Sequence, residues 1–76
     1  MAIEVNARRL LCPMPVIRLQ DAANQAPPGS TIIISCTDPG VINDIPAWCR
    51  INGHNIIEID QQYDEITITV VTENAD

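Results

Sequence analysis

A cysteine followed by two closely spaced prolines stands near the beginning of the sequence, in the stretch Cys12-Pro13-Met14-Pro15. Prolines suit the first turn of a helix, because the N–H groups that they lack have no intrahelical acceptor there. We therefore expect Cys12 to cap a helix whose first residue is Pro13. The positive end of a helix dipole and nearby cations both stabilise a thiolate. The stretch therefore predicts a nucleophilic Cys12 with a lowered pKa, supported by Pro13, Met14 and Pro15.

The charges add a second feature around this cysteine. All four basic side chains are arginines, and Arg8, Arg9 and Arg18 lie within six residues of Cys12. We expect them to stabilise a sulfur anion or to contact an acidic partner. The formal net charge is −6, whereas a protein that grips nucleic acid needs a basic face. Direct nucleic-acid binding is therefore not expected. The sequence has no long apolar run and no basic-then-apolar leader, so we expect a cytoplasmic protein without membrane association.

The other two cysteines carry no comparable signal. Cys36 shares a strand face with isoleucines and Cys49 follows Trp48 on a helix, so we expect both to pack in the core. His54 follows a glycine at a helix end, where a surface or capping role is expected. The cysteines and His54 lack the CxxC and HxxxH spacings of zinc sites. No metal and no other cofactor is therefore expected, and the odd cysteine count does not suggest a disulfide framework.

Periodicity and turn residues divide the chain into elements. Alternating apolar and polar residues indicate strands, and apolar residues spaced three or four apart indicate helices. Pro, Gly and Asp mark the ends of these elements. The predicted elements are a strand over residues 3–7, a helix over 13–25, a strand over 31–36, an irregular turn over 39–43, a helix over 44–52 that ends at Gly53, and strands over 55–60 and 65–71.

This order, β-α-β-α-β-β, predicts the fold class. The last two strands form an antiparallel hairpin, and the helical crossovers return the chain parallel and right-handed. We expect an α/β (α+β) two-layer sandwich: a four-stranded mixed sheet with both helices on one face. The sheet face that meets the helices is expected to carry Ile66, Ile68 and Val70. Residues 1–76 are expected to form a single domain, with a disordered tail from about residue 72.

Two spaced motifs in this order resemble the TusA/SirA family of small sulfur-carrier proteins (sulfurtransferases), from about Ile3 to Val71. The family pattern around the thiol is Asp-x-x-Gly-Leu-x-Cys-Pro-x-Pro. The second pattern contains Asp-Pro, then Asp-Ile-Pro with an aromatic residue, and then Gly-His. The matching residues are Leu10, Cys12, Pro13, Pro15, Asp38, Pro39, Asp44, Ile45, Pro46, Trp48 and His54.

The resemblance implies a function for Cys12. It would accept sulfane sulfur as a persulfide from a donor protein of the cysteine desulfurase or rhodanese type and relay it to an acceptor protein. Family members serve tRNA thiolation, molybdenum-cofactor assembly or sulfur oxidation. Here Asn6 and Arg9 replace the family's aspartate and glycine, and Leu11 and Met14 stand where arginine and glutamate are common. The rim of the site is therefore expected to be more apolar than in members that serve tRNA thiolation.

Two other functions compete with sulfur transfer. The chain could be a non-catalytic protein-interaction or regulatory module, in which Cys12 is only a structural helix cap and exposed positions such as Ile33 and Ile56 bind a partner. It could also be a redox sensor that uses oxidation of the thiolate, although no resolving cysteine is adjacent in sequence.

Overall fold

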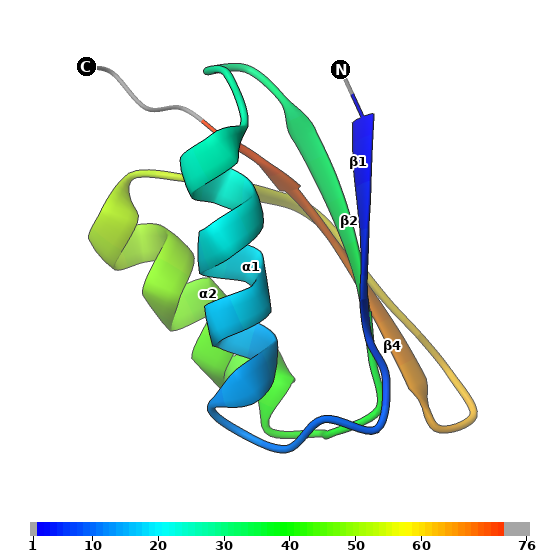
Figure 1. The fold of residues 1–76 in the computed structure, drawn as a ribbon. Helices are drawn as coiled ribbons and strands as arrows, with labels where there is room; N and C mark the ends of the chain where they lie inside the picture. The colour runs from blue at the N-terminus through cyan, green and yellow to red at the C-terminus, as the bar shows by residue number, and fades with distance from the viewer. Residues whose placement is uncertain (1, 73–76) are drawn as a thin grey trace.

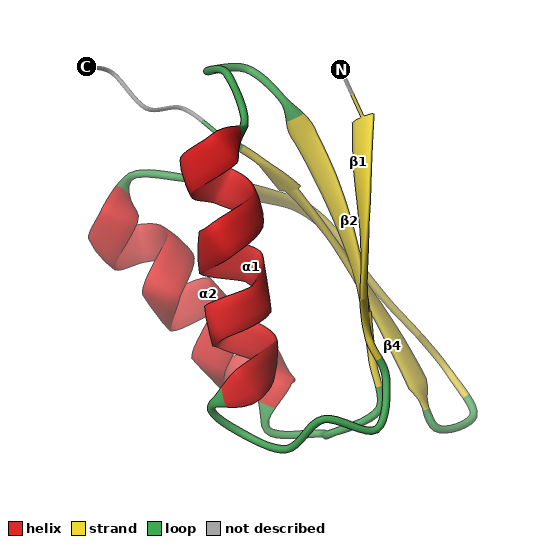
Figure 2. Ribbon diagram, in the orientation of Figure 1, coloured by secondary structure: helices red, strands yellow, loops and turns green. Residues whose placement is uncertain are grey.

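The computed structural model of the protein describes residues 2–72 and has the predicted β-α-β-α-β-β order (Figure 1). The two-layer architecture, with both helices on one side of the sheet, is confirmed (Figure 2). The elements are β1 (Ala2–Ala7), α1 (Met14–Gln25), β2 (Thr31–Cys36), α2 (Val41–Asn52), β3 (Asn55–Gln62) and β4 (Glu65–Val71). None of the helices within residues 2–72 is long and apolar enough to cross a membrane.

The strands form one mixed sheet in the order β1-β2-β4-β3. β1 and β2 are parallel, and β4 pairs antiparallel with both β2 and β3. The register places Val5 opposite Ile34 and Ile34 opposite Ile68, so one apolar row crosses three strands. Because β1 and β2 run in parallel, the loops that follow them leave the sheet at the same end (Figure 1). That shared end is where the functional site lies.

The core lies between the sheet and the helices. Alternate residues of β2 and β4 face the helices and are buried, and the residues between them are half-buried, as period-two strands require. The prediction for Ile66, Ile68 and Val70 is confirmed. The apolar core residues are Ala7, Leu19, Ile32, Ile34, Cys36, Val41, Ile45, Cys49, Ile66, Ile68 and Val70.

The second helix differs from its prediction at its start. The expected irregular turn over 39–43 is present at residues 39 and 40 and wrong for 41–43, because α2 is already helical from Val41. Pro46 lies inside this helix, where it removes one backbone donor. Val41, Ile45 and Cys49 are buried at a spacing of four, so burial of this stripe offsets the lost hydrogen bond. Gly53 ends the helix as predicted, with φ at 78°.

The end of β4 is held more firmly than the sequence suggested. Thr72, the first residue of the predicted tail, is buried. Its N–H donates to the carbonyl of Ser30 at 2.9 Å, and its Oγ1 accepts from the N–H of Ser30 at 3.0 Å. The remainder of the predicted tail, 73–76, lies outside the described residues. The hairpin between β3 and β4 is also tighter than expected, with only Tyr63 and Asp64 outside the strands.

Candidate functional site

The site is built where the β1–α1 loop meets the β2–α2 loop. The N–H of Arg9 donates to Oγ1 of Thr37 at 2.8 Å, and the N–H of Cys12 donates to Oδ2 of Asp38 at 2.9 Å. Each bond joins one loop to the other. Parallel pairing of β1 and β2 brings these segments together although they lie 26 to 28 residues apart. The backbone of Cys12 is therefore positioned by the second motif.

Cys12 itself lies before the helix rather than at its cap. The helix α1 begins at Met14, Pro13 occupies the N-cap position, and the Cys12–Pro13 peptide bond is cis. The expected cap assignment for Cys12 is therefore wrong by one residue. The N–H of Met14 donates to the carbonyl of Leu11 at 2.8 Å. Pro15, in contrast, lies in the first turn as predicted and is buried.

The thiol of Cys12 has an acidic partner. Its Sγ donates a hydrogen bond to Oδ2 of Asp44, in the first turn of α2, at 2.9 Å. A second carboxylate, that of Asp38, lies close by and is held by two backbone donors, the N–H of Cys12 and the N–H of Gly40 at 3.1 Å. These two bonds lower the pKa of Asp38, so it stays ionised. Gly40 lies close to both carboxyl groups, because a Cβ at this position would lie 3.5 Å from Asp38 Oδ1 and 3.7 Å from Asp44 Oδ2.

This environment reverses the expected ionisation of the thiol. The hydrogen bond to Asp44 raises the pKa of Cys12, and desolvation and the charges of Asp44 and Asp38 raise it further. The prediction of a lowered pKa was therefore wrong. It placed Asp38 and Asp44 in the second motif but did not treat them as neighbours of the thiol. The short side chains of aspartates that flank Gly40 reach the neighbouring loop, and that contact becomes visible only once the two loops are paired in space.

Among the described residues, no hydrogen bond or ion pair joins Arg8, Arg9 or Arg18 to the sulfur of Cys12. Arg8 forms an ion pair with Glu65 at 2.6 Å, and this pairing raises its pKa. Arg9 and Arg18 are exposed. Within residues 2–72, the hydrogen bonds of Cys12 go to Asp38 and Asp44 and none goes to an arginine.

Apolar side chains close to Cys12 in the sequence are open to solvent. Leu11 is 73% exposed, Met14 is 40% exposed, and Ile17, one turn into α1, is 41% exposed. These three side chains are termed the apolar rim below. Apolar side chains that leave water on binding contribute most of the affinity of protein contacts. The rim therefore offers a protein partner a contact beside the sulfur.

Cys36 and Cys49 lie in the core, as predicted. Burial raises the pKa of each thiol to about 11. Cys12 is exposed and is the one accessible thiol among the three cysteines, all of which belong to the described part of the chain. His54 donates its N–H to the carbonyl of Cys49 at 2.9 Å, and its ring lies 5.1 Å from that of Trp48. This confirms its expected place at the helix end.

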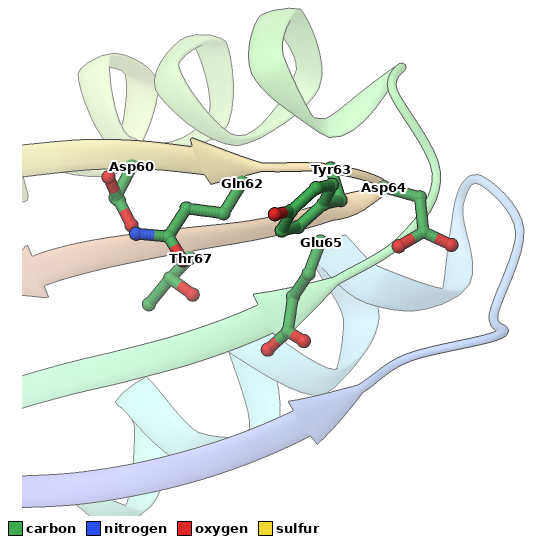
Figure 3. A pocket seen from close by; sticks show the side chains of 6 residues that line it. All are labelled: Asp60, Gln62, Tyr63, Asp64, Glu65 and Thr67. Atoms are coloured by element: carbon green, nitrogen blue, oxygen red, sulfur yellow. The ribbon is translucent and has the colours of Figure 1, made fainter.

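A surface pocket lies elsewhere, at the β3–β4 hairpin. Its side chains lie on the sheet face away from the helices (Figure 3). The lining residues are Asp60, Gln62, Tyr63, Asp64, Glu65 and Thr67. The pocket is acidic and contains no thiol, so it is separate from the chemistry at Cys12.

A family model described as sulfurtransferase TusA matches residues 3–72. The YrkI protein of Bacillus subtilis is 37% identical over 54 residues, which cover 71% of this chain and 72% of that protein. The sulfur carrier protein TusA of Buchnera aphidicola is 31% identical over 55 residues, covering 72% of this chain and 70% of that one.

A solved structure supports the fold. The crystal structure of a SirA-like protein from Desulfitobacterium hafniense superposes with a TM-score of 0.80 at 20% identity, covering 96% of this chain and 99% of that one. The chain belongs to the TusA/SirA family of sulfur carrier proteins. A role in carrying sulfur, with donor and acceptor proteins as partners, follows from that membership.

Proposed function

We propose that Cys12 is the sulfur-carrying residue and that this chain acts as a sulfurtransferase. Cys12 accepts sulfane sulfur as a persulfide from a cysteine desulfurase or rhodanese-type donor and relays it to an acceptor protein. The observation that carries the proposal is the contrast between the exposed Cys12, beside the apolar rim, and the buried Cys36 and Cys49. A carrier thiol must reach two partners in turn, which a surface loop allows.

The transfer balances without an oxidant. A donor persulfide, donor–S–S⁻, reacts with the Cys12 thiol to give the donor thiol and Cys12–S–S⁻. The S–S bond of the donor breaks, a bond from its terminal sulfur to Sγ forms, and the proton of Sγ goes to the released donor thiolate. The reverse exchange delivers sulfur to an acceptor cysteine. Acceptors that lead to tRNA thiolation, molybdenum-cofactor assembly or other sulfur pathways all fit this chemistry.

Sulfur loading tests the proposal directly. After incubation with a cysteine desulfurase and cysteine, intact-mass spectrometry should detect a gain of sulfur on the wild-type chain. Cys12→Ser should abolish the gain, whereas Cys36→Ala and Cys49→Ala, the matched controls, should retain it. A gain that survives Cys12→Ser would exclude Cys12 as the carrier.

One observation favours a second candidate, the non-catalytic interaction module. The hydrogen bond to Asp44 keeps the thiol protonated, and only the thiolate is nucleophilic. A module that binds a partner through the apolar rim alone would take up no sulfur in the same experiment. It would still bind its partner as the Cys12→Ser variant.

A further inference from the structure

We propose that Asp44 makes the position of the Cys12 sulfur depend on whether the carrier is loaded with sulfur. Asp44 holds the protonated thiol of the empty carrier and repels the anionic persulfide of the loaded carrier. This inference rests on the proposed persulfide function. It assigns Asp44 a positioning role at the site and gives the two states of the carrier different surfaces.

The empty state follows from the hydrogen bond at Sγ. In the 2.9 Å contact the Sγ of Cys12 donates to Oδ2 of Asp44, so the shared proton lies on the sulfur. The titratable groups that face this sulfur are Asp44 from α2 and Asp38 from the preceding loop. Arg8 is close to Cys12 in the sequence, but its guanidinium forms an ion pair with Glu65. The thiol of Cys12 therefore faces two carboxyl groups, which favour its protonated form.

The loaded state reverses this attraction. When sulfur has been added, Sγ carries the terminal sulfur in place of its proton and has nothing to donate to Asp44. A persulfide is more acidic than a thiol, so the terminal sulfur carries a negative charge at neutral pH. Like charges a few ångströms apart repel, and Asp38 is fixed by its two backbone donors and adds to that repulsion.

The loop allows the sulfur to respond. Cys12 precedes α1 and its side chain is exposed, so rotation about χ1 moves the sulfur between staggered positions without disturbing the helix. Rotation away from the two carboxylates places the terminal sulfur in solvent, where an acceptor can reach it. The empty carrier is protected from alkylation and oxidation, because both need the thiolate.

The first test measures the empty thiol and needs no sulfur donor. The pKa of Cys12 is read from the pH dependence of alkylation by iodoacetamide. Asp44→Asn removes the charge, and its amide N–H can donate to a thiolate, so the pKa should fall. A fall of one unit gives about tenfold more thiolate at neutral pH. The alkylation rate then rises roughly threefold, because a less basic thiolate is less nucleophilic.

Two matched variants separate position from charge. Asp44→Glu keeps a carboxylate on the same turn and should keep the pKa raised. Glu58→Gln removes one charge from the opposite face of the sheet and should leave the pKa unchanged. An Asp44→Asn variant whose thiol pKa equals that of the wild type would overturn the inference, as would an equal fall in Glu58→Gln.

The second test compares the two load states. Wild-type protein is loaded with inorganic polysulfide, so that a failure of the desulfurase reaction bears on the proposed function and not on Asp44. The ¹³C NMR signal of the Asp44 side-chain carboxylate should shift on loading, as the hydrogen bond from Sγ is lost, and return when a reductant removes the sulfur. An unchanged signal, or a Cys12 that polysulfide cannot load, would overturn the inference.

Discussion

At the scale of single residues, the state of Cys12 is decided by neighbours that are remote in sequence. Asp38 and Asp44 lie 26 and 32 residues further along the chain. The reactive position and its motif could be recognised from the sequence, because Cys12 and its prolines are contiguous. The direction of the pKa shift could not, because local rules describe a helix terminus and not the carboxylates of a neighbouring loop.

Arg9 is a second residue whose environment the structure explains. It has φ at 66°, in the left-handed region where glycine is comfortable and most other residues are strained. The family pattern has glycine at this position. The side chain of Asn6 supports the same turn, because its Oδ1 accepts from the N–H of Arg8 at 3.0 Å, as the family's aspartate could. The loop therefore keeps its shape although two of its pattern residues differ.

Substitutions at Arg9 should rank by backbone strain. Arg9→Gly relieves the strain but adds freedom to the unfolded chain, so the free energy of unfolding should change by less than about 1 kcal/mol. Arg9→Val, which is β-branched, should lower it by about 1–2 kcal/mol. Urea unfolding measures both, and Arg9→Ala serves as the control for the lost guanidinium. Equal stabilities of the Gly and Val variants would contradict this account.

At the scale of elements, the strands were the most predictable part of the molecule. β2 and β4 are bounded as the alternation of β-branched residues indicated. The start of α2 was missed, because the rule that proline interrupts a helix outweighed the stripe of Val41, Ile45 and Cys49. Tertiary burial of that stripe holds the first turn of α2 in place, and this turn carries Asp44.

The C-terminal end of α2 offers a test of how firmly the helix is held. Gly53 has φ at 78°, and a Cβ there would touch nothing within 4 Å. Gly53→Ala should therefore cost only the backbone strain of a left-handed residue, about 1 kcal/mol in the free energy of unfolding. Gly53→Asn should cost less, because asparagine tolerates this conformation. Urea unfolding of the two variants measures the difference, and an Ala variant as stable as the wild type would contradict it.

At the scale of the whole molecule, the two buried thiols link stability to pH. Burial raises the pKa of Cys36 and Cys49 from 9.0 to about 11. A thiol that stays neutral in the fold but ionises in the unfolded chain favours unfolding as the pH rises. Their contribution to stability is therefore complete below pH 9.0 and is lost between pH 9.0 and about 11.

The free energy of unfolding should fall by roughly 2 kcal/mol per buried thiol by the time the pH reaches about 11. Urea unfolding at a series of alkaline pH values should follow this fall. Cys49→Ala lowers the overall stability by leaving a cavity, but it should also reduce the slope with pH by about half. A slope that Cys49→Ala leaves unchanged would show that other groups cause the alkaline loss.

The burial of Cys36 and Cys49 also sets the capacity of the carrier. With two thiols enclosed by the core and one at the surface, a folded chain that works as proposed transports a single atom of sulfur per trip. Sulfur delivery per chain cannot be increased by loading a second cysteine, because Cys36 and Cys49 are buried. The flux through such a pathway is then limited by the number of chains and by how often each one returns to its donor.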